Sequence, residues 1–243
     1  MTAGPLTPTA LVICSTQATC LPVMASSIQQ YLPEDLVVYT AGGNPALFSG
    51  MKVVAFDNQA SNFGDAYNAA IDRAFKDGHQ HILVANDDIV FHPNTWKVFN
   101  DDLESIRTEL PQTKMGLVGV RSDYVIWAQN IRHPGSSQEK DGLRWTKEQE
   151  ILLTPVVAPI LAWISREAWQ TAQFPPTNWY SDNVLCWDLQ QAGFQHFISR
   201  AYVHHAGSQT VGESSKALHD EAWPWVERNR PQLARQLSQQ LQG

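Results

Sequence analysis

The sequence is poor in cysteine and in clustered basic residues, and both shortages limit what the protein can be. Its three cysteines, Cys14, Cys20 and Cys186, form no CxxC pair. This argues against a disulfide framework or a thiolate zinc site and predicts free thiols in a reducing compartment. The 17 Lys and Arg residues do not cluster and are outnumbered by 24 Asp and Glu residues. Because binding to nucleic-acid phosphates depends on basic contacts, no nucleic-acid partner is expected.

The sequence also lacks an apolar run long enough for a membrane helix. The longest, residues 151–164, contains two prolines and is shorter than the roughly 20 residues that a bilayer requires. The N-terminus has no basic region of the kind that begins a signal peptide, so we expect a cytoplasmic protein without a transmembrane segment. The chain does contain 43% hydrophobic residues and nine tryptophans, which is typical of a folded protein with a sizeable core.

Short apolar runs alternate with amphipathic segments in the first half of the chain. The runs that predict buried strands are 10–14, 36–39, 52–56 and 82–85. Before the last run, apolar side chains recur with the helical period at Tyr67, Ala70, Ile71, Ala74 and Phe75. The alternation predicts an α/β fold with a mostly parallel, doubly wound sheet, in which ligands bind at the carboxyl ends of the strands.

The rest of the chain continues this pattern without an internal repeat or a composition shift that would mark a domain boundary. The further strands expected are 116–120, 125–129, 156–164 and 196–205. The further helices expected are one beginning at Pro93-Asn94, a short one from Ser165, one from Ser181 to Gly193, and a helical region over 216–241 interrupted by Pro224 and Pro231. Residues 132–150 show little periodicity and are predicted to form an exposed loop.

The triplet Asn86-Asp87-Asp88 follows an apolar and therefore central strand. Adjacent carboxylates at the carboxyl edge of a sheet repel each other unless a divalent cation lies between them. A metal site is one interpretation of the triplet. The alternative is an ordinary turn, because Asp and Asn also favour strand-to-loop connections and helix caps.

A second acidic candidate is Asp182, at the predicted start of a helix. The helix N-terminus stabilises an ionised carboxylate, and such a group in a cleft can accept a proton from an attacking hydroxyl. The alternative is that Ser181 caps the helix and Asp182 is an ordinary first-turn acid.

The pair His204-His205 ends a strand, where successive side chains point to opposite faces, so at most one imidazole faces a given site. His205 shares the side of Ala201 and Val203, whereas His204 shares the side of Arg200. A hydrogen-bonded structural role is the alternative to metal binding. An imidazole beside Asp88 would help to complete an octahedral Mn²⁺ or Mg²⁺ site with phosphate oxygens and water.

The tryptophans also have two interpretations. Most of them, including Trp163, occupy apolar positions where burial in the core is the default, although Trp163 is retained as a second candidate for a sugar or acceptor contact. Trp179 lies in a polar loop near Asp182, where its flat face could stack on the C–H face of a sugar ring.

Three segments, in this order, resemble motifs of glycosyltransferases with the GT-A fold, especially the inverting family-two enzymes. They are 58–70, which contains Asn58, Gly64 and Asn68; 82–89, with a DxD-type motif from Asn86 to Asp88; and 180–194, which contains Asp182 and precedes the strand ending at His204-His205. The resemblance implies a single GT-A (Rossmann-like) domain, with a mostly parallel central sheet flanked by helices, over 1–215. Residues 216–243 would form a helical extension packed on it.

By this resemblance, Asp88 and His205 bind Mn²⁺ or Mg²⁺, and Asp182 is the catalytic base. The residues implied near the donor nucleotide are Thr16, Asp57, Asn58, Gly64, Asn68, Asn86 and Asp87. The implied activity is transfer of a hexosyl group, with inversion, from a nucleoside diphosphate sugar to a hydroxyl of a carbohydrate or another acceptor. The family's acidic residue after the second strand, which often contacts uracil, has no match in 39–43, so UDP is only the default nucleotide.

Two other functions remain open at this point. A nucleotidyltransferase could use a similar sheet and carboxylates, but it normally has a glycine-rich phosphate loop with a basic residue, which Ala41-Gly42-Gly43-Asn44 lacks. A non-catalytic nucleotide- or sugar-binding module would keep the pocket without an effective base. The oligomeric state is not determined by the sequence.

Overall fold

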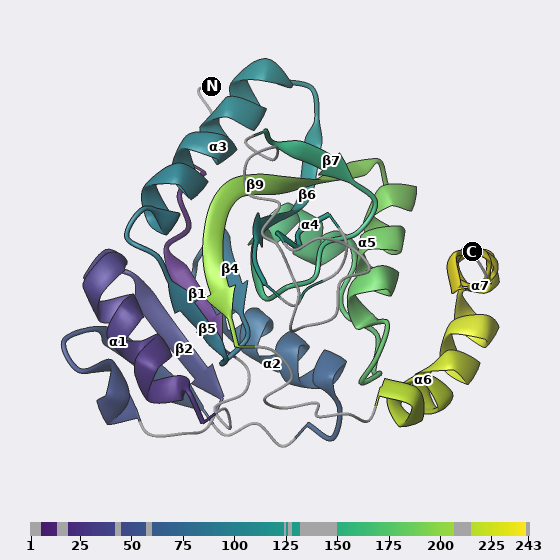
Figure 1. The fold of residues 1–243 in the computed structure, drawn as a ribbon, viewed down its shortest axis with the longest axis horizontal. Coiled ribbons are helices and arrows are strands. Elements are labelled where there is room, and N and C mark those ends of the chain that lie inside the picture. Colours follow the sequence, from purple (N-terminus) through teal and green to yellow (C-terminus); the bar gives the residue numbers. More distant parts are fainter. Residues whose placement is uncertain are drawn as a thin grey trace.

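In the residues that the computed structural model describes (6–13, 19–41, 45–56, 60–123, 125, 128–131, 150–206 and 215–241), nine strands form one sheet with helices on both faces (Figure 1). The strands are β1 (Ala10–Ile13), β2 (Val37–Ala41), β3 (Lys52–Phe56), β4 (His81–Ala85), β5 (Ile89–Phe91), β6 (Lys114–Arg121), β7 (Leu152–Thr154), β8 (Leu161–Ser165) and β9 (Phe194–His205). The helices are α1 (Leu21–Tyr31), the 3₁₀ turn η1 (Pro45–Phe48), α2 (Phe63–Lys76), α3 (Thr95–Glu109), α4 (Arg166–Thr171), α5 (Ser181–Gln191), α6 (Ser215–Asn229) and α7 (Pro231–Leu241).

The strand order is β3-β2-β1-β4-β8-β6-β9-β5, and β7 pairs with β9. Strands β1 to β4 pair in parallel, and β8 lies antiparallel between β4 and β6. Strand β9 is parallel to β6, whereas β5 and β7 are antiparallel to β9. The predicted mostly parallel α/β sheet is therefore confirmed. The carboxyl ends of β4, β6 and β9 share one edge. Strand β4 is an interior strand, as the apolar run 82–85 predicts.

Each face of the sheet is covered by its own set of helices. Helices α1 and α3 contribute Met24, Ile28 and Phe99 to the core on one face. Helices α2, α4 and α5 contribute Ile71 and Leu185, among others, to the core on the other. The apolar face predicted for α2 is the face that is buried. Its start is fixed by Asn62, whose side chain accepts a hydrogen bond from the backbone N–H of Asp65.

Several predicted elements are corrected by the structure. Val125 lies in a bend and 128–129 in a turn, so the strand expected over 125–129 is absent from the described part of that segment. Residues 126–127 lie outside the described residues, and so do residues 132–149 of the predicted loop. The strand expected over 156–164 begins only at Leu161, because prolines 155 and 159 lack the N–H that a sheet ladder needs. Helix α1 and strands β5 and β7 were not predicted.

Helices α6 and α7 pack beside α5, at the right of Figure 1. Their shared core contains Val184, Val226, Leu233, Ala234 and Leu237. The guanidinium of Arg230 donates to both carboxylate oxygens of Asp188 on α5, at 2.6 and 2.7 Å. Helix α6 continues through Pro224, which corrects the expected interruption; the helix breaks only before Pro231. None of the helices in the described part of the chain has the length and apolar character that crossing a membrane requires.

Candidate active site

The Asn86-Asp87-Asp88 triplet lies at the carboxyl end of β4, where parallel strands expose ligand sites. Asp87 and Asp88 are both buried, with 2% and 4% of their surface exposed. Asn86 is half-buried, and its amide oxygen accepts a 2.7 Å hydrogen bond from the hydroxyl of Tyr67 on α2. The backbone N–H of Asn86 donates to Ile160, which precedes β8. Both neighbours therefore fix the first residue of the triplet.

His205 faces Asp88 across a distance of 3.2 Å between Nε2 and Oδ1. The two residues meet because β5, directly after the triplet, pairs with the end of β9, and because the backbone N–H of Ala206 donates to the carbonyl of Asp88. In the described part of the chain, Asp88 Oδ1 is a buried atom to which no group donates a well-aligned hydrogen bond. Leaving a buried carboxylate oxygen in this state is costly.

In the neutral His205 ring, the contact made by the other nitrogen indicates which nitrogen carries the proton. Nδ1 lies 3.3 Å from the carbonyl oxygen of Asp123. A carbonyl only accepts hydrogen bonds, so in the neutral ring this contact places the proton on Nδ1 and a lone pair on Nε2. The lone pair and the carboxylate oxygen then face each other, an arrangement that a cation between them would stabilise. This is how proteins orient an imidazole that binds a metal.

His204 lies on the opposite side of β9 from His205. Its Nδ1 lies 2.9 Å from Asp123 Oδ2, and half of its side chain is exposed. The same carboxylate oxygen accepts a 2.6 Å hydrogen bond from the hydroxyl of Tyr202. Asp123 is not among the residues that the motifs indicate, although it follows the apolar strand predicted at 116–120, as Asp87 follows β4. Its carbonyl orients His205, and its carboxylate holds His204 away from Asp88.

Gly64 and Asn68 join α2 to the segment that leads toward Asp182. A Cβ atom at Gly64 would lie 1.7 Å from the carbonyl oxygen of Pro175, so only glycine fits at this contact. The Asn68 side chain donates to the carbonyl of Phe174 at 2.9 Å and accepts from its N–H at 3.1 Å. These two residues therefore hold the start of α2 against this segment, and their nearness to a donor nucleotide stays a prediction.

Asp182 lies in the first turn of α5 and is half-buried. Burial raises the pKa of its carboxyl group to about 6, and the hydrogen bond that its Oδ1 accepts from the N–H of Asn183 at 2.9 Å acts in the opposite direction. A base whose pKa lies just below neutrality is mostly ionised at pH 7 and still accepts protons readily. Ser181 is buried and bonds to Thr177, so the residue that the sequence suggested as a cap instead holds the preceding turn.

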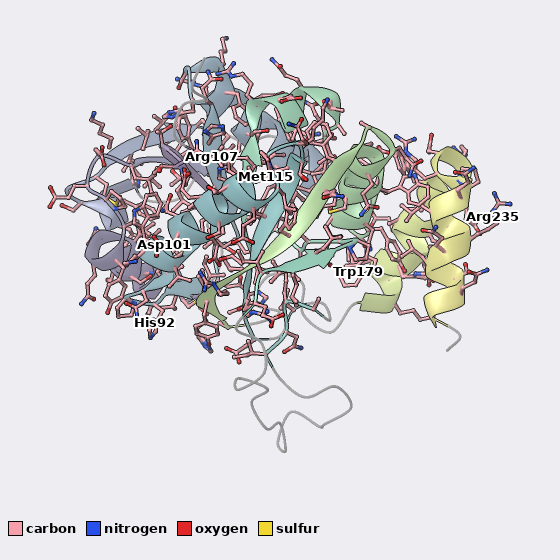
Figure 2. All side chains as sticks on the ribbon, turned by 90° about the horizontal axis from the view of Figure 1, so that it is seen from above. His92, Asp101, Arg107, Met115, Trp179 and Arg235 are labelled. Atoms are coloured by element: carbon pink, nitrogen blue, oxygen red, sulfur yellow. The ribbon has the colours of Figure 1, made fainter. Side chains whose placement is uncertain are left out.

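The two candidate tryptophans lie in different environments. Trp179 is half-buried beside the C-terminal helices (Figure 2). Trp163, with 1% of its surface exposed, lies in the core on β8, and its indole N–H donates to the carbonyl of Leu6. This burial corrects the expectation that Trp163 contacts a sugar or acceptor, and agrees with the core default for that residue. Thr16, Asp57 and Asn58 lie outside the described residues.

The described residues fit a divalent cation at Asp88 and His205 only as a partial ligand set. The buried oxygen of Asp88 and the aligned lone pair of His205 suit Mn²⁺ or Mg²⁺. No group of three or more His, Cys, Asp or Glu side chains gathers around a possible metal position within the described part of the chain. The remaining ligands would have to be diphosphate oxygens and water, as is usual for Mg²⁺ bound with a nucleotide.

Comparison with known proteins identifies the fold. No family model matches the sequence, and no curated protein does. Among solved structures, the chain is similar to two crystal structures of TarS from S. aureus, a glycosyltransferase with the GT-A fold. The TM-scores are 0.51 and 0.53, each with 13% identity over 81% of this chain. The fold is that of the GT-A glycosyltransferases. The matches span only 36% and 59% of the TarS chains.

Proposed function

We propose that the protein transfers a sugar from a nucleoside diphosphate sugar to an acceptor hydroxyl. The default donor is a UDP-sugar, and the default sugar is a hexose. The observation that carries this proposal is the buried contact between Asp88 Oδ1 and His205 Nε2 at the carboxyl end of β4. In a GT-A sheet, this edge is where a donor would bind. Release of a diphosphate from such a donor requires positive charge close to its oxygens.

Asp88 and His205 would hold Mn²⁺ or Mg²⁺, and the carbonyl of Asp123 would keep Nε2 of His205 unprotonated for this purpose. When bound, the ion would neutralise the charge that develops on the departing diphosphate. Asp87 and Asn86 would lie beside the donor. Thr16, Asp57 and Asn58 remain candidates for nucleotide contacts on the basis of the sequence resemblance alone.

Asp182 would act as the base. Its carboxylate would take the proton from the acceptor hydroxyl while that oxygen attacks the anomeric carbon, and the bond to the diphosphate oxygen would break on the opposite face. The configuration at that carbon would therefore invert. The support for this role is the raised pKa of Asp182 and its place at the start of α5. Trp179, three residues earlier and half-buried, would stack on the sugar or the acceptor.

The test is to incubate the protein with Mn²⁺ and a panel of UDP- and GDP-sugars, and to measure released nucleoside diphosphate. Slow hydrolysis of one donor without an acceptor is expected. Asp182→Asn should lower the rate by about 10² to 10⁴-fold, the usual contribution of a general base. Asp220→Asn, which changes an exposed acid on α6, is the control and should leave the rate unchanged. Near wild-type turnover by Asp182→Asn would refute the assignment of the base.

Other products would refute the proposed reaction as a whole. Pyrophosphate release from a nucleoside triphosphate and a sugar phosphate would indicate a nucleotidyltransferase. Binding of nucleotide without turnover of any donor would indicate a non-catalytic module.

The metal site can be tested separately, by titrating Mn²⁺ and following its EPR signal. His205→Ala and Asp88→Asn should each weaken Mn²⁺ binding by at least tenfold, because each removes one of the two protein ligands. His204→Ala should bind Mn²⁺ like the wild type, because its ring lies on the other side of β9 against Asp123. Equal effects of the two histidine substitutions would contradict the assignment of His205.

A further inference from the structure

Tyr180, two residues before Asp182, has an unusual backbone conformation. Its φ and ψ angles are 61° and 8°, in the left-handed region. Within the described residues it is the one non-glycine residue with a positive φ. A bulky side chain is strained in this region, and the strain persists only where the surroundings hold the residue in place. Tyr180 is also the residue whose carbonyl accepts the first hydrogen bond of α5, from the N–H of Val184.

Helix α6 supplies the contacts that hold Tyr180. Nδ1 of His219 lies 2.8 Å from the Tyr180 hydroxyl. The ring of Trp223, one turn further along α6, meets the Tyr180 ring edge-on at 5.5 Å. The His219 and Trp223 rings stack on each other at 5.2 Å, so the hydrogen-bond partner of Tyr180 is itself supported. A second contact joins the same two segments, from the Asn178 amide to the Glu221 carboxylate at 3.0 Å.

Helix α6 is also anchored to the protein by contacts that do not involve the Tyr180 hydroxyl. Val226, in its C-terminal half, lies in the same buried apolar cluster as Val184 of α5. The residue just after it, Arg230, makes a two-pronged ion pair with Asp188. Helix α6 and the part of α5 after its first turn therefore form one fixed unit. The turn from Asn178 to Asp182 is attached to this unit at Asn178 and Tyr180, and Asp182 lies at its end.

We propose that Tyr180 and His219 are positioning residues for Asp182: α6 holds Tyr180 in its left-handed conformation, and this directs the Asp182 carboxylate toward the acceptor. The inference rests on the proposed role of Asp182 as the base. It gives the C-terminal helices a part in the reaction without any contact between them and the reacting atoms. Rotation of Tyr180 toward an ordinary conformation would turn the first turn of α5 and move the carboxylate.

The test removes the Tyr180–His219 hydrogen bond from each side while keeping both rings. Tyr180→Phe and His219→Phe should each lower kcat about tenfold, measured as hydrolysis of the donor found in the panel, with the KM for donor changed less than twofold. The double variant should also lose about tenfold rather than a hundredfold, because both substitutions break the same interaction. His219→Gln, whose amide oxygen can accept the bond, should recover most of kcat. Asp220→Asn, beside His219, should behave like the wild type.

The pH profile separates positioning from a general loss of stability. If the carboxylate of Asp182 turns toward water, its pKa falls toward the ordinary range, so the acidic limb of kcat should move to lower pH in Tyr180→Phe and His219→Phe. Thermal unfolding of each variant serves as the control for folding. Wild-type kcat and an unmoved acidic limb in both variants, or additive losses in the double variant, would overturn the inference while leaving the proposed function intact. An active Asp182→Asn would instead refute the base itself.

Discussion

Replacing the proposed base should make the folded protein more stable. Burial raises the pKa of Asp182 from the ordinary 3.8 to about 6. Between these two values the folded state binds more protons than the unfolded state, so this carboxyl group makes the protein less stable as the pH rises through that range. Above pH 6 the whole cost is present. Asp182→Asn removes the titrating group but keeps an oxygen that can accept the hydrogen bond from the Asn183 N–H.

The size of the effect follows from the pKa difference. At pH 7.5 a change from 3.8 to about 6 corresponds to about 3 kcal/mol. Since Asp182 is only half-buried by surface exposure, water screens part of this, and a gain of about 1 to 3 kcal/mol is expected. At pH 4 the Asp182 carboxyl group is protonated in nearly all folded molecules. The stability gained by Asp182→Asn should therefore fall to about 0.5 kcal/mol or less.

Thermal unfolding of wild type and Asp182→Asn, without metal or nucleotide, measures this directly. A gain of 1 kcal/mol raises the Tm of a protein of this size by about 2 to 4 °C, so the variant should melt several degrees higher at pH 7.5 and nearly with the wild type at pH 4. The same variant should be the one that loses activity. An unchanged or lower Tm at pH 7.5, or a difference independent of pH, would refute the burial argument.

Two further predictions follow from the site. The kcat of the wild type should fall about tenfold between pH 7 and pH 5. A base with a pKa near 6 is about 90% ionised at pH 7 and about 10% ionised at pH 5. A kcat that stays constant down to pH 5 would indicate a base with an ordinary pKa. Gly64→Ala should lower the free energy of unfolding by about 1 to 3 kcal/mol, because the added methyl group overlaps the Pro175 carbonyl. Unfolding in denaturant measures this loss. An unchanged denaturant concentration at the midpoint would contradict the close contact between Gly64 and Pro175.

The sequence by itself determined the parts of the fold that depend on local patterns. Strands β1 to β4 are short apolar runs, and the buried face of α2 is the predicted set of residues with helical spacing. The position of Asp88 at the end of an interior strand followed from the apolar sequence before it. The separation of His204 and His205 onto opposite sides of β9 followed from the alternation of side chains along a strand. These features require only the chemistry of neighbouring residues.

The tertiary structure decided what depends on residues far apart in the chain. No local pattern marks Asp123 as the partner of His205, Gly64 as the point where α2 meets Pro175, or α6 as the support of Tyr180. In each case the free energy of the contact depends on two segments that only folding brings together, so neither segment alone carries the signal.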